Sequence, residues 1–353
     1  MSQPKYEQVR EQLLLRISRG ELRPGEKLKC EAQLAEEFGV SAITIRKALS
    51  LLVESGHIRR ARGSGSYVSE AGTAATPSRL IAMMLTQESY PALSLTRIIS
   101  GIQRTLTRAG YSLLIDWNSA NPKISREGIE RMLSQQVEGF LIYPFDPARN
   151  REELDLILSR GRPYVLIDRH DYGKPSPYVG PNNYDGGLLA TRALLEMGHR
   201  KIRFCGSLFF LSSEQERYAG FCHAMRQAGL PYGPQTLMER PDYDEIVRLV
   251  RAGELTALFC CSDRLAGKLA HDLPARGVRI PEDLSVFGFD DNIYTPDNPI
   301  PLSTVRQDFD LIGQRAAELL LWRLTQPGDV PPHHVLTDVQ LVLRQSARPL
   351  PRG

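Results

Sequence analysis

Apolar runs recur along the chain from Leu80 onward, and amphipathic stretches separate most of them. The runs read IAMML, SLLID, GFLIY, YVLID, IRFCG, ALFCC and LSVFGF. The stretches between them include 97–109, 126–135, 151–160, 184–197 and 214–228. Continuous apolar strands that alternate with helices are typical of a parallel sheet covered on both faces. Because the segment is longer than one doubly wound sheet usually needs, we expect an α/β domain with two lobes.

The first 68 residues have a different pattern, which predicts three helices and a hairpin. Apolar residues at helical spacing mark the helices, and Ser41 is a suitable N-cap for the third. The buried stripe expected for that helix is Ile45, Ala48, Leu49 and Leu52. Two short extended runs, HIRR and SYV, flank a glycine-containing turn. Residues 69–78 (SEAGTAATPS) contain no large apolar side chain, so we expect a linker there.

The charge of the chain is concentrated in one place. The formal charge is +3, and the whole excess lies within residues 41–70. A neutral body with one basic segment indicates a local contact with a polyanion. The outer face of the predicted third helix carries Ala42, Ile43, Arg46 and Lys47. Such a helix fits the major groove of B-DNA, where apolar groups meet thymine methyls and basic groups reach phosphates or guanine edges.

The predicted hairpin supports the same interpretation. It carries Arg59, Arg60 and Arg62, and glycines 63 and 65 allow a tight tip that suits a minor groove. The alternative is a solvated three-helix bundle whose charges bind nothing. The helix spacing, followed by a basic hairpin, favours double-stranded DNA as the partner.

This segment resembles the winged helix-turn-helix of the GntR family. The resemblance rests on LRPGEKL, LAEEFGVSAITIRKALSLLVESGHI and GSGSYV, in that order and spacing. It implies DNA contacts from Thr44, Arg46, Ser64 and the hairpin glycines. Together with the helix face and the basic hairpin, the predicted DNA-binding residues are Ser41, Ala42, Ile43, Thr44, Arg46, Lys47, Arg62, Ser64 and Gly65. The sequence departs from the family pattern twice. Lys29-Cys30-Glu31 replaces the usual Pro-Ser-Glu, which removes a hydroxyl cap, and Ala42 replaces a frequent arginine.

Polar residues follow several of the apolar runs in the large domain. They are Thr86, Asp168, Ser262, Asp263, Asp290 and Asp291. The carboxyl ends of parallel strands form the ligand crevice of an open α/β sheet. Carboxylates there, with Arg217 as a forked donor and Tyr243 as an apolar face, suit a ligand with several hydroxyls. Each residue alone has a structural alternative, a helix cap or an ion pair, so the prediction depends on their joint placement.

Residues 80–346 resemble the effector domain of the LacI/GalR family, which has the fold of periplasmic sugar-binding proteins. The resemblance rests on several segments, among them VEGFLIYP, NNYDGGLLATRALLEMGHRKI, IPEDLSVFGFDD and STVRQDFDLIGQRAAELLL. It implies effector contacts from Thr86, Asp168, Arg217, Tyr243, Ser262 and Asp290. We predict Arg169 as a further effector-binding residue. Many sugar-responsive relatives have Asn where this chain has Ser262. The two modules together resemble the arabinose-responsive repressor type.

We therefore expect a transcription regulator that binds operator DNA as a homodimer. The expected effector is a sugar held between two lobes, and the expected targets are carbohydrate-use genes. One alternative is a purine or phosphorylated corepressor, which Arg169 and Arg217 would suit. Another is a sugar-acting enzyme that carries a DNA-binding head. The sequence contains no G-x-S-x-G, Walker or H-E-x-x-H motif, so we expect neither catalysis nor a cofactor or metal.

The expected boundaries follow from these segments. Residues 1–68 form the DNA-binding domain, 69–78 the linker, 79–346 the effector-binding and dimerisation domain, and 347–353 a tail. No apolar run is long enough to span a membrane, and the start has no signal-peptide pattern. The five cysteines show no C-x-x-C spacing, which is typical of reduced thiols. We therefore expect the protein in the cytoplasm.

Overall fold

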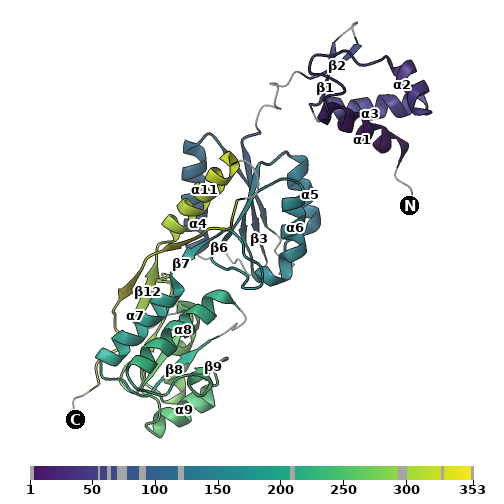
Figure 1. Ribbon diagram of the computed structural model, residues 1–353. Helices are drawn as coiled ribbons and strands as arrows, with labels where there is room; N and C mark the ends of the chain where they lie inside the picture. The colour runs from purple at the N-terminus through teal and green to yellow at the C-terminus, as the bar shows by residue number, and fades with distance from the viewer. Residues whose placement is uncertain are drawn as a thin grey trace. The chain divides into compact units, whose positions relative to one another are not determined.

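The structure of the chain is a computed structural model that describes most of its residues. The described residues are 4–54, 56–61, 65–69, 78–86, 93–117, 123–206, 211–292, 300–326 and 330–350. The chain forms two compact units, Met1–Ser78 and Arg79–Gly353, which are described separately as the head and the body (Figure 1).

The head has the predicted three helices and antiparallel hairpin. Its elements are α1 (Lys5–Ser18), α2 (Glu31–Phe38), α3 (Ala42–Glu54), β1 (Ile58–Ala61) and β2 (Gly65–Val68). The stripe predicted for α3 is its buried face, since each of its four apolar residues is at most 1% exposed. This stripe packs against apolar residues of α1, α2 and the hairpin, which include Leu13, Leu34, Ile58 and Val68. The head is therefore built around α3.

Two local features fix the ends of α2. The backbone N–H of Cys30 donates to Oε1 of Gln33 at 3.1 Å, so the glutamine satisfies a donor at the start of the helix. The helix ends at Gly39, whose φ of 62° lies in the left-handed region that favours glycine. The turn that follows leads directly into α3.

The amino-terminal lobe of the body is a six-stranded parallel sheet. Its strands, in the order β13-β7-β6-β5-β3-β4, are His334–Thr337, Tyr178–Pro181, Tyr164–Ile167, Gly139–Tyr143, Leu80–Leu85 and Ser112–Trp117. Helices α4 (Leu93–Arg108) and α11 (Phe309–Thr325) cover one face, with α5 (Arg126–Ser134) and α6 (Arg151–Ser159) on the other (Figure 1). Within β3, Ile81 and Met83 face the first pair, whereas Ala82 and Met84 face the second. The two-sided burial explains the continuous apolar runs.

The carboxyl-terminal lobe contains a four-stranded parallel sheet. Its strands, in the order β11-β10-β8-β9, are Ser285–Phe287, Ala257–Cys260, Ile202–Cys205 and Leu237–Met238. Its helices are α7 (Asn183–Glu196), α8 (Ser212–Gln227), α9 (Tyr243–Arg251) and α10 (Asp263–Asp272). Short 3₁₀ turns lie at Pro147–Asn150, Pro234–Thr236 and Pro274–Arg276. The body is thus the two-lobed α/β domain that the sequence predicts.

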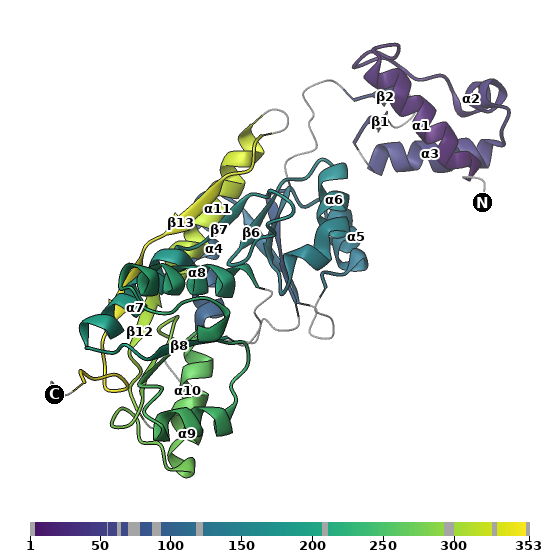
Figure 2. The same ribbon diagram turned by 60° about the horizontal axis from the view of Figure 1, so that its bottom comes forward.

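Three segments connect the lobes (Figure 2). The chain passes from β7 into α7, returns through β12 (Thr304–Gln307) to α11, and crosses again between β13 and β14 (Val339–Val342). Strands β12 and β14 pair in antiparallel fashion, so two of the crossings are hydrogen-bonded to each other.

Glycines allow one close helix contact in each lobe. A Cβ added at Gly101 or Gly313 would overlap a carbonyl oxygen of the facing helix, so α4 and α11 approach closely. The same holds for Gly187 and Gly220, where α7 meets α8. A Cβ at Gly187 of α7 would overlap the carbonyl oxygen of Arg217 of α8. This glycine therefore lets α8 lie close to α7 at the turn that carries Arg217.

The predicted linker and the predicted tail flank the body of the chain. The linker prediction falls mostly on 70–77, which lie outside the described residues. The predicted tail begins with residues bound to the carboxyl-terminal lobe, since Arg348 N donates to Ser285 Oγ at 3.1 Å and Leu350 N donates to Met197 O at 2.8 Å. The cysteines and the helices bear on two further expectations from the sequence. All five cysteines are free thiols.

None of the helices that the structure describes is long and apolar enough to cross a membrane.

Candidate functional site

The outer face of α3 is exposed in the head. Ile43 is 77% exposed, which is unusual for a large apolar side chain, and Ala42, Arg46 and Lys47 are exposed beside it. An exposed isoleucine between basic residues adds nothing to the core, so its chemistry fits a partner surface.

Acidic and aromatic side chains hold the basic residues of this face. Glu31 lies 3.0 Å from Nη2 of Arg46 and 3.6 Å from Nη2 of Arg60. One carboxylate therefore joins α3 to the β1–β2 hairpin, which is the wing of the head. The ammonium of Lys47 lies 4.0 Å from the centre of the Tyr6 ring. These contacts keep the cations of α3 and the wing together on one side.

The other predicted DNA-binding residues have different environments. Ser41 caps α3, because its Oγ accepts from Thr44 N at 3.2 Å and lies 2.9 Å from the Thr44 hydroxyl. Gly65 has a φ of 109°, a conformation that side chains rarely adopt. Arg62 and Ser64 lie outside the described residues.

In the amino-terminal lobe, the predicted effector-binding residues follow β3 and β6. Thr86 is fully buried, and among the described residues its hydroxyl has no hydrogen-bond partner. Asp168 has a φ of 71°, a left-handed conformation that is uncommon for aspartate. The Tyr143 hydroxyl donates to its Oδ2 at 3.2 Å. Burial, assisted by the Asp168 charge, raises the pKa of Tyr143 far above its ordinary value, so the phenol stays a donor.

Arg169 lies beside Asp168 and is held mainly by backbone groups. Its Nη1 donates to the carbonyls of Pro144 and Phe145 at 3.3 and 3.0 Å. Its Nε lies 3.5 Å from Asp168 Oδ2, and its guanidinium lies 5.9 Å from the Tyr143 ring centre. The guanidinium of Arg169 is therefore already paired with the carboxylate of Asp168.

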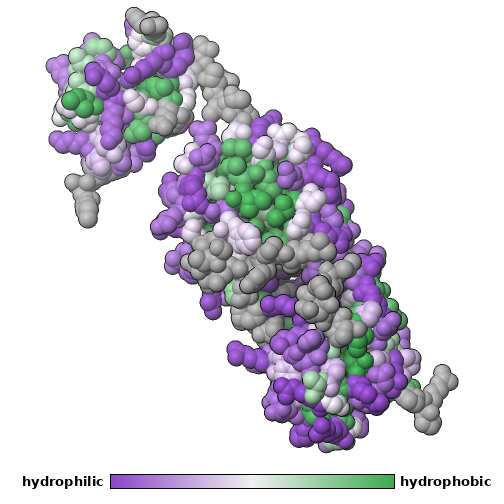
Figure 3. Space-filling view, turned by 180° about the vertical axis from the view of Figure 1, so that it is seen from behind, coloured by the Kyte–Doolittle hydropathy of each residue, from purple (hydrophilic) through white to green (hydrophobic). Residues whose placement is uncertain are grey.

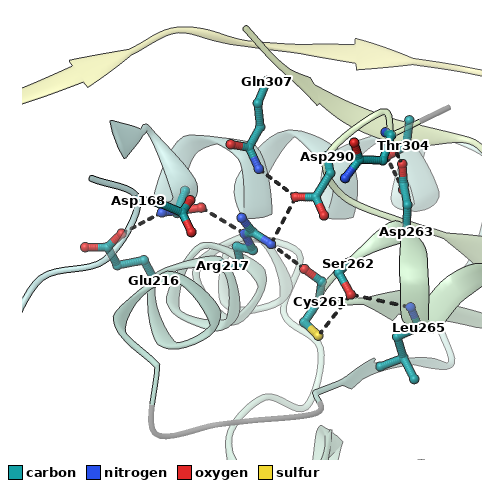
Figure 4. A network of polar contacts seen from close by, with 12 residues as sticks. Asp168, Glu216, Arg217, Cys261, Ser262, Asp263, Leu265, Asp290, Thr304 and Gln307 are labelled. Carbon is teal, nitrogen blue, oxygen red and sulfur yellow. Dashed lines mark hydrogen bonds and ion pairs between the residues drawn. The ribbon is translucent and has the colours of Figure 1, made fainter. Parts of the chain in front are cut away.

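Arg217 is the centre of the site in the carboxyl-terminal lobe (Figure 4). It is 5% exposed, and its guanidinium lies 3.7 Å from the centre of the Phe289 ring. Its Nε donates to Asn183 Oδ1 at 2.8 Å, and its Nη1 donates to the Cys261 carbonyl at 2.5 Å. Nη1 also lies 3.5 Å from Asp290 Oδ1. These contacts fix the orientation of the guanidinium.

Asp290 faces Arg217, and its pKa is shifted from the ordinary value. Burial raises its pKa to about 6, the Arg217 charge opposes this shift, and the Asp168 charge adds to it. Gln307 Nε2 donates to its Oδ1 at 2.6 Å. Its φ of 122° is a strained backbone conformation for a residue with a side chain. The charge of Asp168 in the amino-terminal lobe therefore acts on the pKa of Asp290 in the carboxyl-terminal lobe.

Ser262 and Asp263 have structural contacts. Ser262 Oγ accepts from Leu265 N at 3.4 Å and so caps α10. Asp263 accepts from the Thr304 hydroxyl at 2.6 Å and from Asn292 N at 3.0 Å. Burial raises the pKa of Asp263 well above its ordinary value, and the Asp290 charge adds to this shift. Asp263 therefore supports the loop that carries Asp290.

Tyr243 does not join the other predicted effector-binding residues. It begins α9, and its hydroxyl donates to Asp272 Oδ2 at 2.8 Å. Asp272 ends α10, whereas Ser262 caps its start, and a ten-residue helix is about 15 Å long. The structure thus corrects the placement of Tyr243, because this residue follows no apolar strand directly.

Four residues of the site were not predicted from the sequence. They are Tyr143, Asn183, Phe289 and Gln307. Tyr143 and Gln307 end strands β5 and β12, so the rule of polar residues at strand ends could have found them. Asn183 lies in NNYDGG, at the start of a helix, where an asparagine is usually taken as a cap.

The arrangement suits recognition of hydroxyl groups. Among the described residues, no partner approaches Nη2 of Arg217, and the second oxygens of Asp168 and Asp290 have no hydrogen bond. Two acceptors and one forked donor match neighbouring hydroxyls, which both donate and accept. No group of three or more His, Cys, Asp or Glu in the described chain is arranged to hold a metal ion.

The chain matches two family models. Residues 5–68 match the bacterial regulatory proteins of the gntR family, and residues 191–347 match the periplasmic binding protein-like domain. Among solved structures, a transcriptional regulator CelR–cellobiose complex superposes with a TM-score of 0.64 at 24% identity, over 87% of this chain and 92% of that one. A lac repressor dimer bound to operator superposes with a TM-score of 0.63 at 21% identity, over 78% and 96%. Both likenesses establish the fold.

Curated relatives extend the likeness. The "Arabinose metabolism transcriptional repressor" of Geobacillus stearothermophilus is 27% identical over 98% of both chains. The "HTH-type transcriptional repressor PurR" of Haemophilus influenzae strain PittEE is 31% identical over 77% of this chain and 82% of its own. The chain therefore belongs to the bacterial transcription regulators that join a GntR-type winged helix to a periplasmic-binding-protein-like domain of the LacI/GalR type.

Proposed function

We propose that this regulator is a dimeric repressor of carbohydrate-use genes, released from its operator by a neutral sugar that binds between the lobes of the body. The observation that carries the sugar assignment is that Arg217 of α8 lies 3.5 Å from Asp290, which follows β11, while the charge of Asp168, which follows β6 of the other sheet, acts on Asp290. Relatives named for arabinose metabolism, and fold neighbours with bound cellobiose or ribose, support the same class of ligand.

The charges of the site favour a neutral ligand. Each guanidinium is already close to a carboxylate, Arg169 to Asp168 and Arg217 to Asp290, both at 3.5 Å. A phosphate would bring two negative charges to a site without a free positive charge, and it would face both carboxylates. Sugar hydroxyls instead donate to the carboxylates and accept from Arg217 Nη2. We therefore favour a sugar over a phosphorylated corepressor.

The head would bind DNA through the exposed face of α3. Ile43 and Ala42 offer apolar contact to thymine methyls, while Arg46 and Lys47 reach phosphates or guanine edges. The wing adds the exposed Arg59.

A second copy of the chain would pair through the amino-terminal lobe. Its sheet ends at β4, an edge strand on which Ile115 and Trp117 are each 45% exposed. Figure 3 shows a patch of apolar side chains on this lobe. The neighbouring α4 carries an open groove of about 570 Å³ lined by Thr96, Ile99, Ser100, Gln103, Arg104, Thr107 and Arg108. A two-fold dimer would cover this edge and match a two-fold operator.

Sugar and operator would influence each other through the three crossing segments. A ligand that contacts both lobes changes the arrangement of those segments, and the effect on DNA affinity must be reciprocal. We assign the DNA-binding domain to residues 1–68 and the effector-binding and dimerisation domain to 79–346. We further place the protein in the cytoplasm, where its operator is, and assign it no catalytic activity, in line with the repressors it resembles.

The first experiment is thermal unfolding of the full chain with L-arabinose, D-ribose, cellobiose, adenine and glucose 6-phosphate. A ligand at 100 times its Kd adds about 2.7 kcal/mol to the native state, which a melting curve detects. The sugar that shifts the midpoint is then tested for release of operator DNA. A shift with adenine or glucose 6-phosphate alone would replace the sugar proposal by the corepressor alternative.

A further inference from the structure

Glu216 immediately precedes the effector-binding Arg217 on α8, and its carboxylate joins two distant parts of the body. Oε1 lies 2.8 Å from Nε2 of His170, in the loop between β6 and β7 of the amino-terminal lobe. Oε2 accepts from Nδ2 of Asn183 at 3.0 Å, at the start of α7. One side chain of the carboxyl-terminal lobe therefore contacts both the opposite lobe and the segment that has just crossed from it.

The contact with Glu216 determines which way the Asn183 amide points. A carboxylate only accepts hydrogen bonds, so the NH₂ end of the amide must face Glu216. The carbonyl end then faces Arg217, where Oδ1 accepts from Nε at 2.8 Å. If the amide turned over, its NH₂ group would meet the guanidinium donor and the hydrogen bond would be lost. Glu216 thus acts on Arg217 through Asn183.

His170 anchors the other end of this chain of contacts. Its backbone N–H donates to Ser212 Oγ, the first residue of α8, at 3.0 Å. Its ring lies against Tyr172, Tyr178 and His334, with centroid distances of 4.6, 4.9 and 5.2 Å. Tyr178 begins β7 and His334 begins β13, and both strands lead to crossings between the lobes. The histidine is therefore tied to the segments whose arrangement changes when the lobes move.

We propose that Glu216 is a positioning residue for effector binding, which orients Arg217 through Asn183 and ties that orientation to His170 of the opposite lobe. The inference rests on the proposed sugar site. Its consequence is that a movement between the lobes reaches the sugar-binding guanidinium through hydrogen bonds as well as through packing. Sugar affinity then depends on residues that make no contact with the sugar.

An exchange of the amide and the carboxylate tests this relation with variants of unchanged shape. N183D places a second carboxylate against Glu216, so the two groups repel and Glu216 no longer holds the side chain at position 183 in the orientation that faces Arg217. We expect the sugar that shifts the melting curve to bind the full-length N183D chain about tenfold more weakly in calorimetry. In N183D/E216Q the glutamine NH₂ donates to the new aspartate, and affinity is expected to return to within about threefold of wild type. If the double variant binds no better than N183D, the proposal is overturned.

Two further measurements separate the possible failures. E245Q removes a carboxylate that pairs with Arg203 at 2.7 Å elsewhere in the same lobe, and it is expected to bind sugar as wild type does. Crystal structures of the wild-type and N183D chains without sugar are expected to differ in the orientation of the Arg217 guanidinium. An unchanged guanidinium in N183D overturns the positioning role even if no sugar in the panel binds. If the wild-type chain binds no sugar but the Arg217 guanidinium changes its orientation in N183D, only the proposed function is overturned.

Discussion

The Asp290 carboxylate lies 3.5 Å from Nη1 of Arg217, in surroundings where burial opposes its ionisation. The pKa of about 6 reflects this opposition, since burial raises it and the guanidinium lowers it. A carboxyl with a raised pKa keeps its proton in the folded chain after the unfolded chain has lost it. Its contribution to stability is therefore complete below its ordinary pKa of 3.8 and is lost as the pH rises through about 6.

The same titration predicts a pH dependence of sugar binding. Below about pH 6 one oxygen of Asp290 carries a proton and no longer accepts from a sugar hydroxyl, so affinity should fall by up to tenfold per pH unit. D290N should bind more weakly at pH 7.5 and show no change down to pH 5. Calorimetry between pH 5 and 8 measures both. D283N is the control, because Arg279 holds the pKa of Asp283 at about 2, outside this range. A pH-dependent D290N chain would assign the titration to another group.

Arg217→Lys should separate ligand recognition from DNA binding. Lysine keeps the positive charge beside Asp290 but cannot bond Asn183 and Cys261 at once or stack on Phe289. We expect sugar affinity to fall at least about tenfold, with operator affinity without sugar unchanged. Titration of labelled operator, with and without sugar, measures both. Loss of operator binding in R217K would show that the arginine is needed for the fold of the body.

Regular periodicity explains which parts of the fold were predictable from sequence. The stripe of α3 repeats every three to four residues, so its buried face follows from the pattern alone. Asp168 and Asp290 follow apolar strands of the two sheets, and each parallel sheet presents the carboxyl ends of its strands at one edge. Both predictions depend on patterns within a few consecutive residues, and the regular geometry of the helix or sheet then places those residues on one face or at one edge.

Contacts between distant segments were not predictable in this way. Arg217 bonds residues that lie 34 and 44 positions away, and no periodicity relates them. Ser262 follows a strand exactly as a ligand-binding residue would, yet its hydroxyl caps a helix, and serine serves both purposes. Tyr243 rested on a local match without a strand before it, which is why its placement failed.

Arg46→Ala should weaken operator binding and lower its salt dependence. If Arg46 neutralises a phosphate, its loss reduces the slope of log affinity against log salt by about one. Fluorescence anisotropy at several salt concentrations gives this slope. R315A removes an arginine from the surface of α11 and should leave the slope unchanged. An unchanged slope in R46A together with lower affinity would instead assign Arg46 to a base.

Ile43→Ser should weaken operator binding by a different mechanism. The side chain is 77% exposed, so serine should leave the melting midpoint of the head unchanged. Loss of an apolar contact with a thymine methyl costs about 1–2 kcal/mol, and it releases no counterions. We therefore expect about tenfold weaker operator binding with the wild-type salt slope. Equal operator affinities of I43S and wild type would remove α3 from the DNA interface.

Gly187→Ala tests how the helix pair of the carboxyl-terminal lobe supports the effector site. The added Cβ would overlap the carbonyl oxygen of Arg217, so α8 must move away from α7. Overpacking of this kind costs about 1–3 kcal/mol, and the displaced helix carries both Arg217 and Glu216. We expect a lower melting midpoint and weaker sugar binding in one variant. E196A, at the end of α7, should change neither, because Glu196 is an exposed polar residue. A G187A chain that melts earlier but binds sugar normally would show that the site tolerates movement of α8.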